Sequence, residues 1–473
     1  MGDFHPPAEA FNGLVGRTRQ ITYDCRMTAP SAAKLLADLW RIADQPDAGL
    51  QTVTLTGSEP ALPSSFAIGT VAQATVAASA LAASELWHLR TGRRQRVSVD
   101  MRHAGIEFRS ERYLRLDGKP PEEHRDKTVG VYRTGDGRWI RLHTNLPHHR
   151  AGTLKLLGAD YDRASVQRAI DRWEAFKLED AAAAAGLVVT ATRSFEEWDA
   201  HPQGAAVAGL PLFTIERIGD TPPQPLPPGD RPLAGVKVLD LTRVIAGPVC
   251  GRTLAAHGAD VLNISAAHLP FMEALVIDTN RGKLSAQIDL RETSGREKLA
   301  ALLCEADVFI QGYRPGAIAQ YGFSAEEAAR LRPGIICMSL CAYGHAGPWA
   351  SRRGFDSLVQ NADGLNVAEA EAAGARGPNP EPKPLPAQAL DHATGNLMAF
   401  GAMTALKRRA TEGGSWHVRC SLAQTGHWVR GLGRIEGGLA TADPSFEDIR
   451  DLTEGSDSGF GRSVYFSSRP GAV

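Results

Sequence analysis

An aspartate stands at the start of an apolar segment in the stretch "KPLPAQALDHATGNLMAFGAM", residues 383–403. The preceding prolines predict a loop, and the small and apolar residues after Asp391 predict a helix. Aspartate is among the preferred N-cap residues, so Asp391 can serve as a helix cap. Taken by itself, the residue is best interpreted as a cap. The roles of cap and nucleophile are not exclusive, because an aspartate with an unperturbed pKa of about 3.9 is ionised at neutral pH and a helix N-terminus favours the charge.

Several cations lie in loops that also contain glycine or proline. They are Arg243 in "TRVIAGP", Lys283 in "NRGKLS", Arg314 in "QGYRPG" and Arg353 in "RRGFD". Each one alone is consistent with an exposed surface charge. Together they suit a phosphate-bearing ligand. Because neither GxGxxG nor a Walker sequence occurs in these loops, a nicotinamide cofactor or a nucleoside triphosphate held in the usual way is not predicted.

Strand and helix patterns alternate after residue 235. The predicted strands are "VKVLDL", "DVLNI", "LSAQIDL", "DVFIQ" and "GIICMSL", with helical segments between them, and Ser324 and Glu327 form a capping box at one helix start. This alternation predicts an α/β fold with a Rossmann-like, doubly wound parallel sheet between residues 232 and about 390. In such sheets ligands bind beyond the carboxyl ends of the strands, where the cation-bearing loops would lie.

A proline-rich stretch, "GDTPPQPLPPGDRP", divides the chain into two parts. The predicted organisation is an unassigned segment 1–64, a region 65–218 that contains a second, smaller α/β domain at about 115–205, a linker 219–231, a sheet-forming region 232–435 and a polar C-terminal tail 436–473.

Composition excludes several classes of protein. Lys and Arg total 52 against 53 Asp and Glu, so no global field attracts nucleic acid or an anionic membrane. The long run "AIGTVAQATVAASALAASELW" contains Thr, Gln and Ser and predicts a partly buried helix of a soluble protein. The six cysteines have no zinc spacing, so no metal is predicted, and they suit free thiols in a reducing compartment. With no secretion signal in the sequence, the cytoplasm is the expected location.

Residues 232–435 resemble the family III CoA-transferases, which include formyl-CoA transferase, carnitine CoA-transferase and α-methylacyl-CoA racemase. The matching blocks include "PLAGVKVLDLTRVIAGP", "NRGKLSAQIDL", "ADVFIQGYRPGAIAQYGF" and "ALDHATGNLMAFGAMTAL". Residues 65–218 resemble the later half of the same family through "RTGRRQRVSVDM", "VYRTGDGRWIRLHT" and "AAAAAGLVVTATRSFEEWDAHPQG". The resemblance therefore implies that the family's two halves occur here in swapped order.

The resemblance implies a transferase that moves CoA from an acyl-CoA to a carboxylic acid. In the family motif D-x-x-T-G the aspartate is the nucleophile, which corresponds to Asp391. Coenzyme A would enter as the acyl-CoA substrate. The family's CoA-binding motifs correspond to Arg243, Val244, Ile245, Lys283, Tyr313, Arg314 and Arg353.

The sequence departs from the family pattern in several places. No glycine-rich loop that would shield an intermediate is found in the N-terminal half. Asn263 and Ser265 are uncharged where relatives usually have a Lys-Ile-Glu pattern. Gly312 stands where asparagine is common, and Gln320 stands where a basic residue is frequent. His392 is interpreted as a local hydrogen-bonding residue, because neighbouring helical residues face different sides. Asp356 in "GFD" is interpreted as structural.

An internal repeat is visible in the sequence. Residues 71–101 and 390–422 both have a small-residue helix, a basic end, a glycine and a short strand. Aligned on these glycines, the repeat brings Asp391 opposite Val71 or Thr70. The first copy has no carboxylate there.

Two other functions stay open. An acyl-CoA racemase of the same superfamily needs a proton-transferring histidine in "GHD", where this chain has Phe355, although His345 or His392 could substitute in a rearranged site. A non-catalytic acyl-CoA-binding protein would explain the swapped order, but the intact "DHATGN" motif counts against it.

The resemblance also implies a homodimer, because family members form interlocked pairs. We expect light scattering at micromolar concentration to give the mass of two chains. A purely monomeric sample would contradict the expectation.

Overall fold

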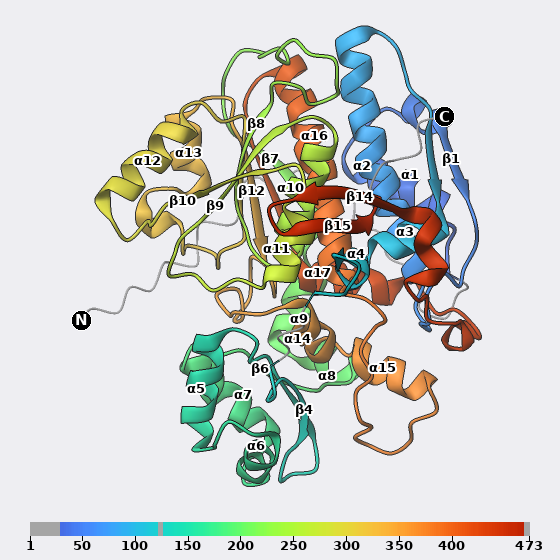
Figure 1. The fold of residues 1–473 in the computed structure, drawn as a ribbon, viewed down its shortest axis with the longest axis vertical. Helices are drawn as coiled ribbons and strands as arrows, with labels where there is room; N and C mark the ends of the chain where they lie inside the picture. The colour runs from blue at the N-terminus through green and yellow to red at the C-terminus, as the bar shows by residue number, and fades with distance from the viewer. Residues whose placement is uncertain (1–28, 122–125, 468–473) are drawn as a thin grey trace.

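The computed structural model describes residues 29–121 and 126–467 (Figure 1). The first 28 residues of the segment that the sequence left unassigned lie outside this part. The rest of that segment forms helix α1 (Ala32–Ile42), the 3-10 helix η1 (Asp47–Thr52) and strand β1 (Val53–Thr56).

The centre of the molecule is a seven-stranded sheet with the order β10-β9-β8-β11-β12-β13-β7. Six strands run parallel, and β7 pairs with β13 in the antiparallel sense. The prediction of an α/β fold with a large parallel sheet is confirmed. The strands are β7 (Phe213–Gly219), β8 (Lys237–Leu241), β9 (Asp260–Ser265), β10 (Leu284–Gln287), β11 (Val308–Gln311), β12 (Ile336–Cys341) and β13 (Ser415–Ser421).

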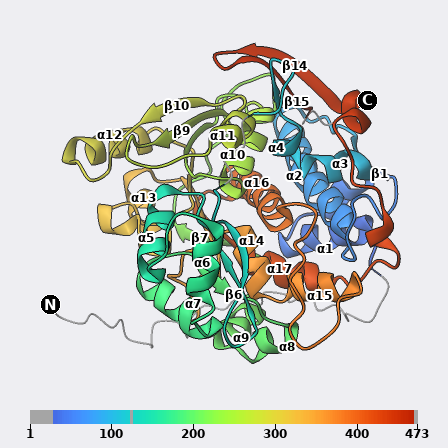
Figure 2. The same ribbon diagram turned by 60° about the horizontal axis from the view of Figure 1, so that its bottom comes forward.

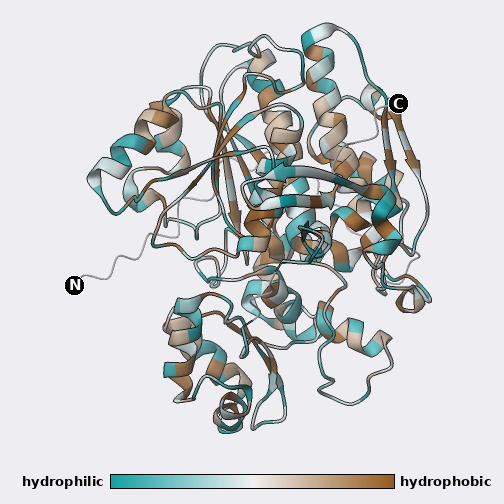
Figure 3. Cartoon of the chain, in the orientation of Figure 1, coloured by the Kyte–Doolittle hydropathy of each residue, from teal (hydrophilic) through white to brown (hydrophobic). Residues whose placement is uncertain are grey.

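Helices cover both faces of this sheet because its inner strands are apolar on both sides. Val238 and Ile310 join the core beneath α10 (Ala246–Ala256) and α16 (Ala389–Glu412). Leu239 and Phe309, which alternate with them, join the core beneath α12 (Thr293–Leu303) and α13 (Ala325–Leu331). Figure 3 shows apolar residues concentrated along these strands and along α16. Ser324 and Glu327 form the predicted capping box of α13.

The sheet extends beyond the predicted range of 232 to about 390. Strand β7 precedes the proline-rich linker, and β13 follows the helix that contains Asp391. The sequence pattern ended at β12 because neither strand continues the strand-helix alternation that marked the others. Both strands close the sheet at one edge, and the linker between β7 and β8 contains no helix or strand.

The two copies of the sequence repeat form similar units. Helices α2 (Ile68–Thr91) and α16 are both 24 residues long and pack against each other. Gly92 and Gly413 end them with positive φ angles of 71° and 75°, a conformation that favours glycine. Each unit continues into a strand and a capped helix, β2 (Val97–Asp100) with α3 (Met101–Glu107), and β13 with α17 (Leu422–Gly431).

The strands of the two units have different neighbours. Strand β13 belongs to the central sheet, whereas β2 pairs only with β1 in a separate parallel pair. The two units also contact each other through α2 and α16, and most residues of both helices are buried.

The smaller domain has an antiparallel sheet, β4-β5-β6, with helices on it. Its core includes Tyr132, Ile140, Leu142, Val166 and Ile170. Figure 2 shows its helices grouped on one side of the molecule. The elements are β4 (Gly130–Arg133), β5 (Trp139–Leu142), α5 (Pro147–Leu157), α6 (Arg163–Ile170), α7 (Ala175–Ala184) and β6 (Val189–Ala191).

The predicted polar tail contains regular structure. Strands β14 (Thr453–Ser458) and β15 (Gly461–Phe466) form a hairpin that pairs with β3 (Arg115–Leu116) from the first half of the chain. The remaining elements are α4 (Ser110–Tyr113), α8 (Phe195–Ala200), α9 (Pro202–Ala208), α11 (Glu273–Thr279), η2 (Ala319–Tyr321), α14 (Asp356–Ala362), α15 (Leu365–Ala372), η3 (Gly438–Ala440) and η4 (Glu447–Leu452).

A buried charge network joins the two halves of the chain. Arg252 on α10 donates to Asp278 at 2.8 Å and to Ser110 at 3.1 Å, and it also pairs with Glu107. The Arg252 side chain is 4% exposed and that of Asp278 is 0% exposed. Buried charges require partners, so the network constrains how the halves pack.

We expect Arg252→Met to lower the free energy of unfolding by about 3 kcal/mol or more, because Asp278 and Glu107 would lose a buried partner. Urea denaturation measures the change. Lys237→Met, which removes an exposed ion pair with Glu305, is the control and should have little effect. Equal losses in both variants would contradict the expectation.

Candidate active site

The central sheet has a switch point between β8 and β11. From β8 the chain builds β9 and β10 on one side, and it then crosses over to build β11 and β12 on the other side. Ligands of open parallel sheets bind at such a point, beyond the carboxyl ends of the strands. The loops that leave β8 and β11 there contain Arg243, Val244, Tyr313 and Arg314.

The loop after β8 has a strained backbone. Val244 has a φ of 76°, which β-branched residues rarely adopt. The loop is held from below, because Asp240 accepts a hydrogen bond of 2.9 Å from the Thr242 N–H and one of 2.8 Å from Lys283 Nζ. Such strain persists only where the surroundings impose it, and it is common at functional sites. Ile245 is the N-cap residue of α10, whose first turn has no side-chain cap.

Lys283 lies inside the protein. Its side chain is 0% exposed, and its ammonium also donates to the Pro248 carbonyl at 2.9 Å. Burial lowers the pKa of Lys283, and the Asp240 charge opposes that shift. Lys283 therefore stabilises the strained loop, and the structure does not bring it together with the exposed cations as the motif had suggested.

Three exposed arginines converge from separate loops. Burial, and then the positive charges of Arg314 and Arg243, lower the pKa of Arg353, so Arg353 lies within electrostatic reach of both. Arg243 donates to the Pro270 carbonyl at 3.3 Å, and Arg353 donates to the Gly186 carbonyl of the smaller domain at 3.1 Å. We call Arg243, Arg314 and Arg353 the arginine cluster.

Tyr313 lies beside this cluster. Burial raises the pKa of its phenol, and the positive charge of Arg243 opposes that shift. Its backbone N–H donates to Gln311 Oε1 at 2.9 Å, which orders the start of the loop after β11.

Asp391 is the third residue of α16 and not its N-cap, a position that Gln388 occupies without a side-chain hydrogen bond. The cap comes from a distant residue. Asp356 Oδ2 accepts the N–H groups of Leu390 at 2.8 Å and Asp391 at 3.0 Å. Asp391 is 8% exposed, and its carboxylate has no hydrogen-bond partner within the described ranges. The interpretation of Asp356 as structural agrees with this contact.

The sequence predicted that Asp391 is ionised at its ordinary pKa, and the structure contradicts this. Burial, followed by the negative charges of Asp356 and Glu111, raises the pKa of Asp391 well above its usual range. The pKa of Asp356 is raised to about 6, mainly by burial. The helix N-terminus favours a carboxylate, but burial beside two other acidic groups outweighs it. The unperturbed aspartate pKa of about 3.9 therefore does not apply to Asp391 in the folded protein.

The residues after Asp391 position its helix. His392 Nε2 lies 3.1 Å from Glu111 Oε2, so the expected hydrogen-bonding role of His392 is present in the structure. A Cβ on Gly395 would lie only 2.5 Å from the Ala246 carbonyl oxygen, so glycine allows α16 to approach the first turn of α10. The sequence could not indicate Glu111, because it comes from the other half of the chain.

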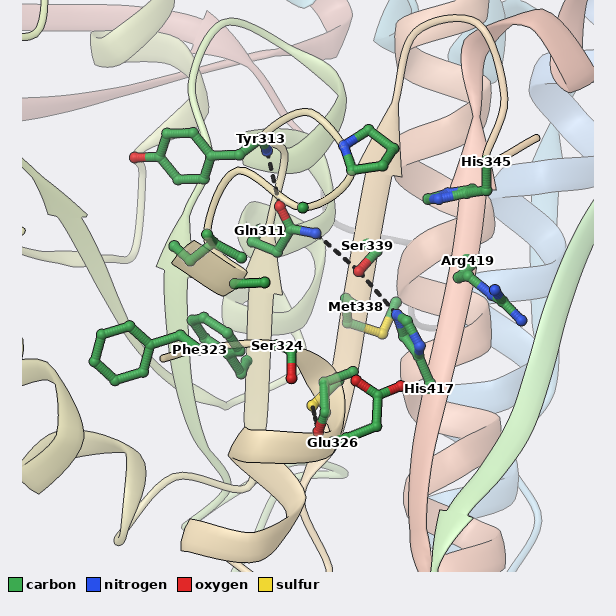
Figure 4. A pocket seen from close by; sticks show the side chains of 17 residues that line it. Gln311, Tyr313, Phe323, Ser324, Glu326, Met338, Ser339, His345, His417 and Arg419 are labelled. Atoms are coloured by element: carbon green, nitrogen blue, oxygen red, sulfur yellow. Dashed lines mark hydrogen bonds between the residues drawn. The ribbon is translucent and has the colours of Figure 1, made fainter. Parts of the chain in front are cut away.

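A cavity of about 210 Å³ lies over β11, β12 and β13, away from Asp391 (Figure 4). Gln311 donates to Ser339 Oγ at 2.8 Å, and His417 Nε2 lies 2.8 Å from the same oxygen. His345, which also lines the cavity, contacts the Cys420 carbonyl through Nε2 at 3.1 Å. Neither Asp391 nor the arginine cluster lines this cavity.

Two features are absent from the part of the chain that the structure describes. No three His, Cys, Asp or Glu residues there are arranged to hold a metal ion. No helix there has the length and apolarity that a membrane crossing requires.

Comparison with known proteins identifies the family. The sequence model of CoA-transferase family III matches residues 40–224 and 233–436, so this chain belongs to CoA-transferase family III. An acyl-CoA transferase of Gibberella moniliformis is 28% identical over 72% of this chain and 66% of its own length. The acetyl-coenzyme A transferase nodX of Hypoxylon pulicicidum is 29% identical over 65% of this chain. This chain spans only 55% of that second relative.

A solved structure is also similar in sequence. A CAIB/BAIF family protein from Brucella suis is 31% identical over 42% of this chain and 55% of its own, with a TM-score of 0.37.

We expect the Asp391 carboxyl to titrate above the usual aspartate range, and to titrate at lower pH in Asp356→Asn, because that substitution removes the negative charge that raises its pKa most. NMR of aspartate labelled with ¹³C at the carboxyl group measures both midpoints. The Asp391→Asn spectrum assigns the signal. The control Asp289→Asn removes a half-buried carboxyl that is paired with Arg291 and whose pKa is about 2. An Asp391 midpoint that is the same with and without Asp356 would contradict the expectation.

Proposed function

We propose that this protein transfers CoA from an acyl-CoA thioester to a carboxylic acid through a covalent intermediate on Asp391. The observation that carries the proposal is the placement of Asp391. Its carboxylate has no protein partner within the described ranges, and its helix packs at Gly395 against the first turn of α10, beside the sheet's switch point. A nucleophile needs such a free oxygen next to a ligand crevice.

The reaction would proceed through two exchanges. An Asp391 oxygen attacks the thioester carbonyl, the C–S bond breaks, and a mixed anhydride and CoA thiolate form. The thiolate attacks the aspartyl carbonyl and releases the donor carboxylate, which leaves an aspartyl-CoA thioester. The acceptor carboxylate attacks this thioester and releases CoA thiolate again. The thiolate then attacks the acceptor carbonyl of the new anhydride, which gives acceptor acyl-CoA and regenerates the Asp391 carboxylate.

Groups near Asp391 can support these steps. Asp391 has to lose its proton before it attacks, since burial and neighbouring charges raise its pKa. Each attack forms an oxyanion, and the uncapped N–H groups of the first α10 turn are candidates to stabilise it. The arginine cluster would bind phosphates of CoA, with Tyr313, Val244 and Ile245 as neighbouring contacts.

The rival functions receive less support. A racemase needs a second proton-transferring residue. Phe355 cannot transfer a proton, His345 lines the separate cavity, and His392 is fully buried against Glu111. A binding protein has no need of a carboxylate without partners in a buried helix start, where it raises the electrostatic cost of folding.

We also propose that the substrates are acyl-CoA thioesters and carboxylic acids, that two chains associate, and that the enzyme works in the cytoplasm. The names of the two fungal relatives support acyl-CoA as a substrate class. The five cysteines of the described part are unpaired, which suits a reducing compartment.

We expect incubation with a suitable acyl-CoA to leave an acyl or CoA adduct on Asp391. Hydroxylamine should convert that residue to its hydroxamate, which peptide mass spectrometry locates. Short and medium acyl-CoAs are screened as donors with common carboxylates as acceptors. Asp391→Asn should abolish the adduct while CoA binding remains, because asparagine has the same shape.

The rival functions predict other outcomes. A racemase would exchange α-deuterium without any adduct. A binding protein would return every acyl-CoA unchanged, and failure of all donors to label Asp391 would overturn the proposal. Asp289→Asn, at a half-buried carboxyl paired with Arg291, is the matched control and should leave labelling intact.

A further inference from the structure

The cavity over β11, β12 and β13 contains a serine and a histidine in direct contact. Ser339 on β12 and His417 on β13 both line it, and His417 Nε2 lies 2.8 Å from Ser339 Oγ (Figure 4). A serine hydroxyl becomes a nucleophile when a neutral histidine within hydrogen-bond reach can take its proton.

Gln311 orders the Ser339 hydroxyl. Its Oε1 accepts the Tyr313 N–H at 2.9 Å, so its amide nitrogen faces Ser339 and donates to Oγ at 2.8 Å. With the His417 hydrogen on Nδ1, the Ser339 hydroxyl donates its own hydrogen to His417 Nε2. The second amide hydrogen of Gln311 has no partner among the described residues, and it can donate to the oxyanion that forms when Oγ attacks a carbonyl.

His417 is neutral at physiological pH. Burial, followed by the positive charges of Arg419 and His345, lowers the pKa of His417 to about 4, and the negative charges of Glu326 and Glu216 oppose that shift. A histidine with the ordinary pKa of about 6.5 is largely protonated in mild acid. His417 therefore still has a free nitrogen to accept a proton in mildly acidic solution.

The cavity suits a small uncharged acyl group. It encloses about 210 Å³, and Phe309, Phe323 and Met338 are among its apolar lining residues. An apolar cavity of about 150 Å³ already holds a benzene molecule, so the space is sufficient for a short acyl chain.

The Ser339–His417 pair is separate from the proposed CoA transfer. Phe309 and Cys337 line the cavity and belong to the core beneath α12 and α13, whereas Asp391 is on α16, which covers the other face of the sheet. Tyr313 lines the cavity and also lies beside the arginine cluster, so the two places are neighbours with different reactive groups.

We propose that Ser339 and His417 form a second nucleophilic site, which hydrolyses small carboxylic esters. Ser339 Oγ attacks the ester carbonyl carbon, and its proton passes to His417 Nε2. The C–O bond to the alcohol breaks, the alcohol leaves with that proton, and the acyl group remains on Ser339. Water then attacks the acyl-serine and gives a proton to His417, which returns it to Ser339 as the carboxylic acid leaves.

Ester hydrolysis by the Asp391→Asn protein tests the inference, because that protein lacks the carboxylate of the proposed transferase. We expect release of p-nitrophenol from p-nitrophenyl acetate, and we expect Ser339→Ala or His417→Gln to lower kcat/KM by about 100-fold or more. The rate should persist from neutral pH down to about pH 5, since the pKa of His417 is about 4. A fluorophosphonate reagent should label Ser339, which peptide mass spectrometry locates.

Two variants are matched controls and should leave the rate and the labelling intact. His345→Gln removes another histidine of the same cavity, and Ser285→Ala removes an exposed serine on β10. A rate that survives Ser339→Ala, a label on another residue, or a rate that falls with a midpoint near pH 6.5 would overturn the inference. Complete absence of hydrolysis and of labelling would do the same, and it would leave the proposed CoA transfer untouched, because that reaction is measured on Asp391.

Discussion

The hydrogen bonds from the Leu390 and Asp391 N–H groups to the Asp356 carboxylate organise the candidate site. A buried helix start needs acceptors or donors from elsewhere, because its first N–H groups have no partner within the helix. Here the acceptor is the first residue of α14, next to Phe355, which stacks on His143 of the smaller domain. Burial, and then the same Asp356 charge that accepts the Asp391 N–H, raise the pKa of the Asp391 carboxyl, so the position and the ionisation of Asp391 are coupled.

The first repeat unit has the same kind of helix cap but no acidic residue at the position of Asp391. Glu59 accepts the N–H of Thr70 at 2.6 Å, as Asp356 accepts that of Asp391. Thr70 and Asp391 are each the third residue of their helices. Both units therefore use a remote carboxylate to cap a buried helix, and only the second places a carboxylate beside that cap. A purely structural role for Asp391 would not require a carboxylate in the second unit where the first has Thr70.

Burial distinguishes two groups of cations that the sequence alone does not separate. Lys283 and Arg252 are inside the protein, and each has an aspartate partner at 2.8 Å. Buried charges without partners are too costly to persist, so such residues are committed to the fold. The arginine cluster remains exposed, where its mutual repulsion is tolerated and a phosphate or carboxylate can relieve it. The paired charges therefore lie beneath the loops, and the exposed arginines lie on them.

Local sequence determined much of this protein. Strand-helix alternation, the capping box at Ser324 and the proline-rich linker all act through neighbouring residues, and the motif around Asp391 indicated the family. Tertiary structure decided what depends on distant residues. It added β7 and β13 to the sheet, made Asp356 the cap of α16 and brought Glu111 to His392. It also changed the acidity of Asp391, because a pKa depends on burial and on charges that only folding brings together.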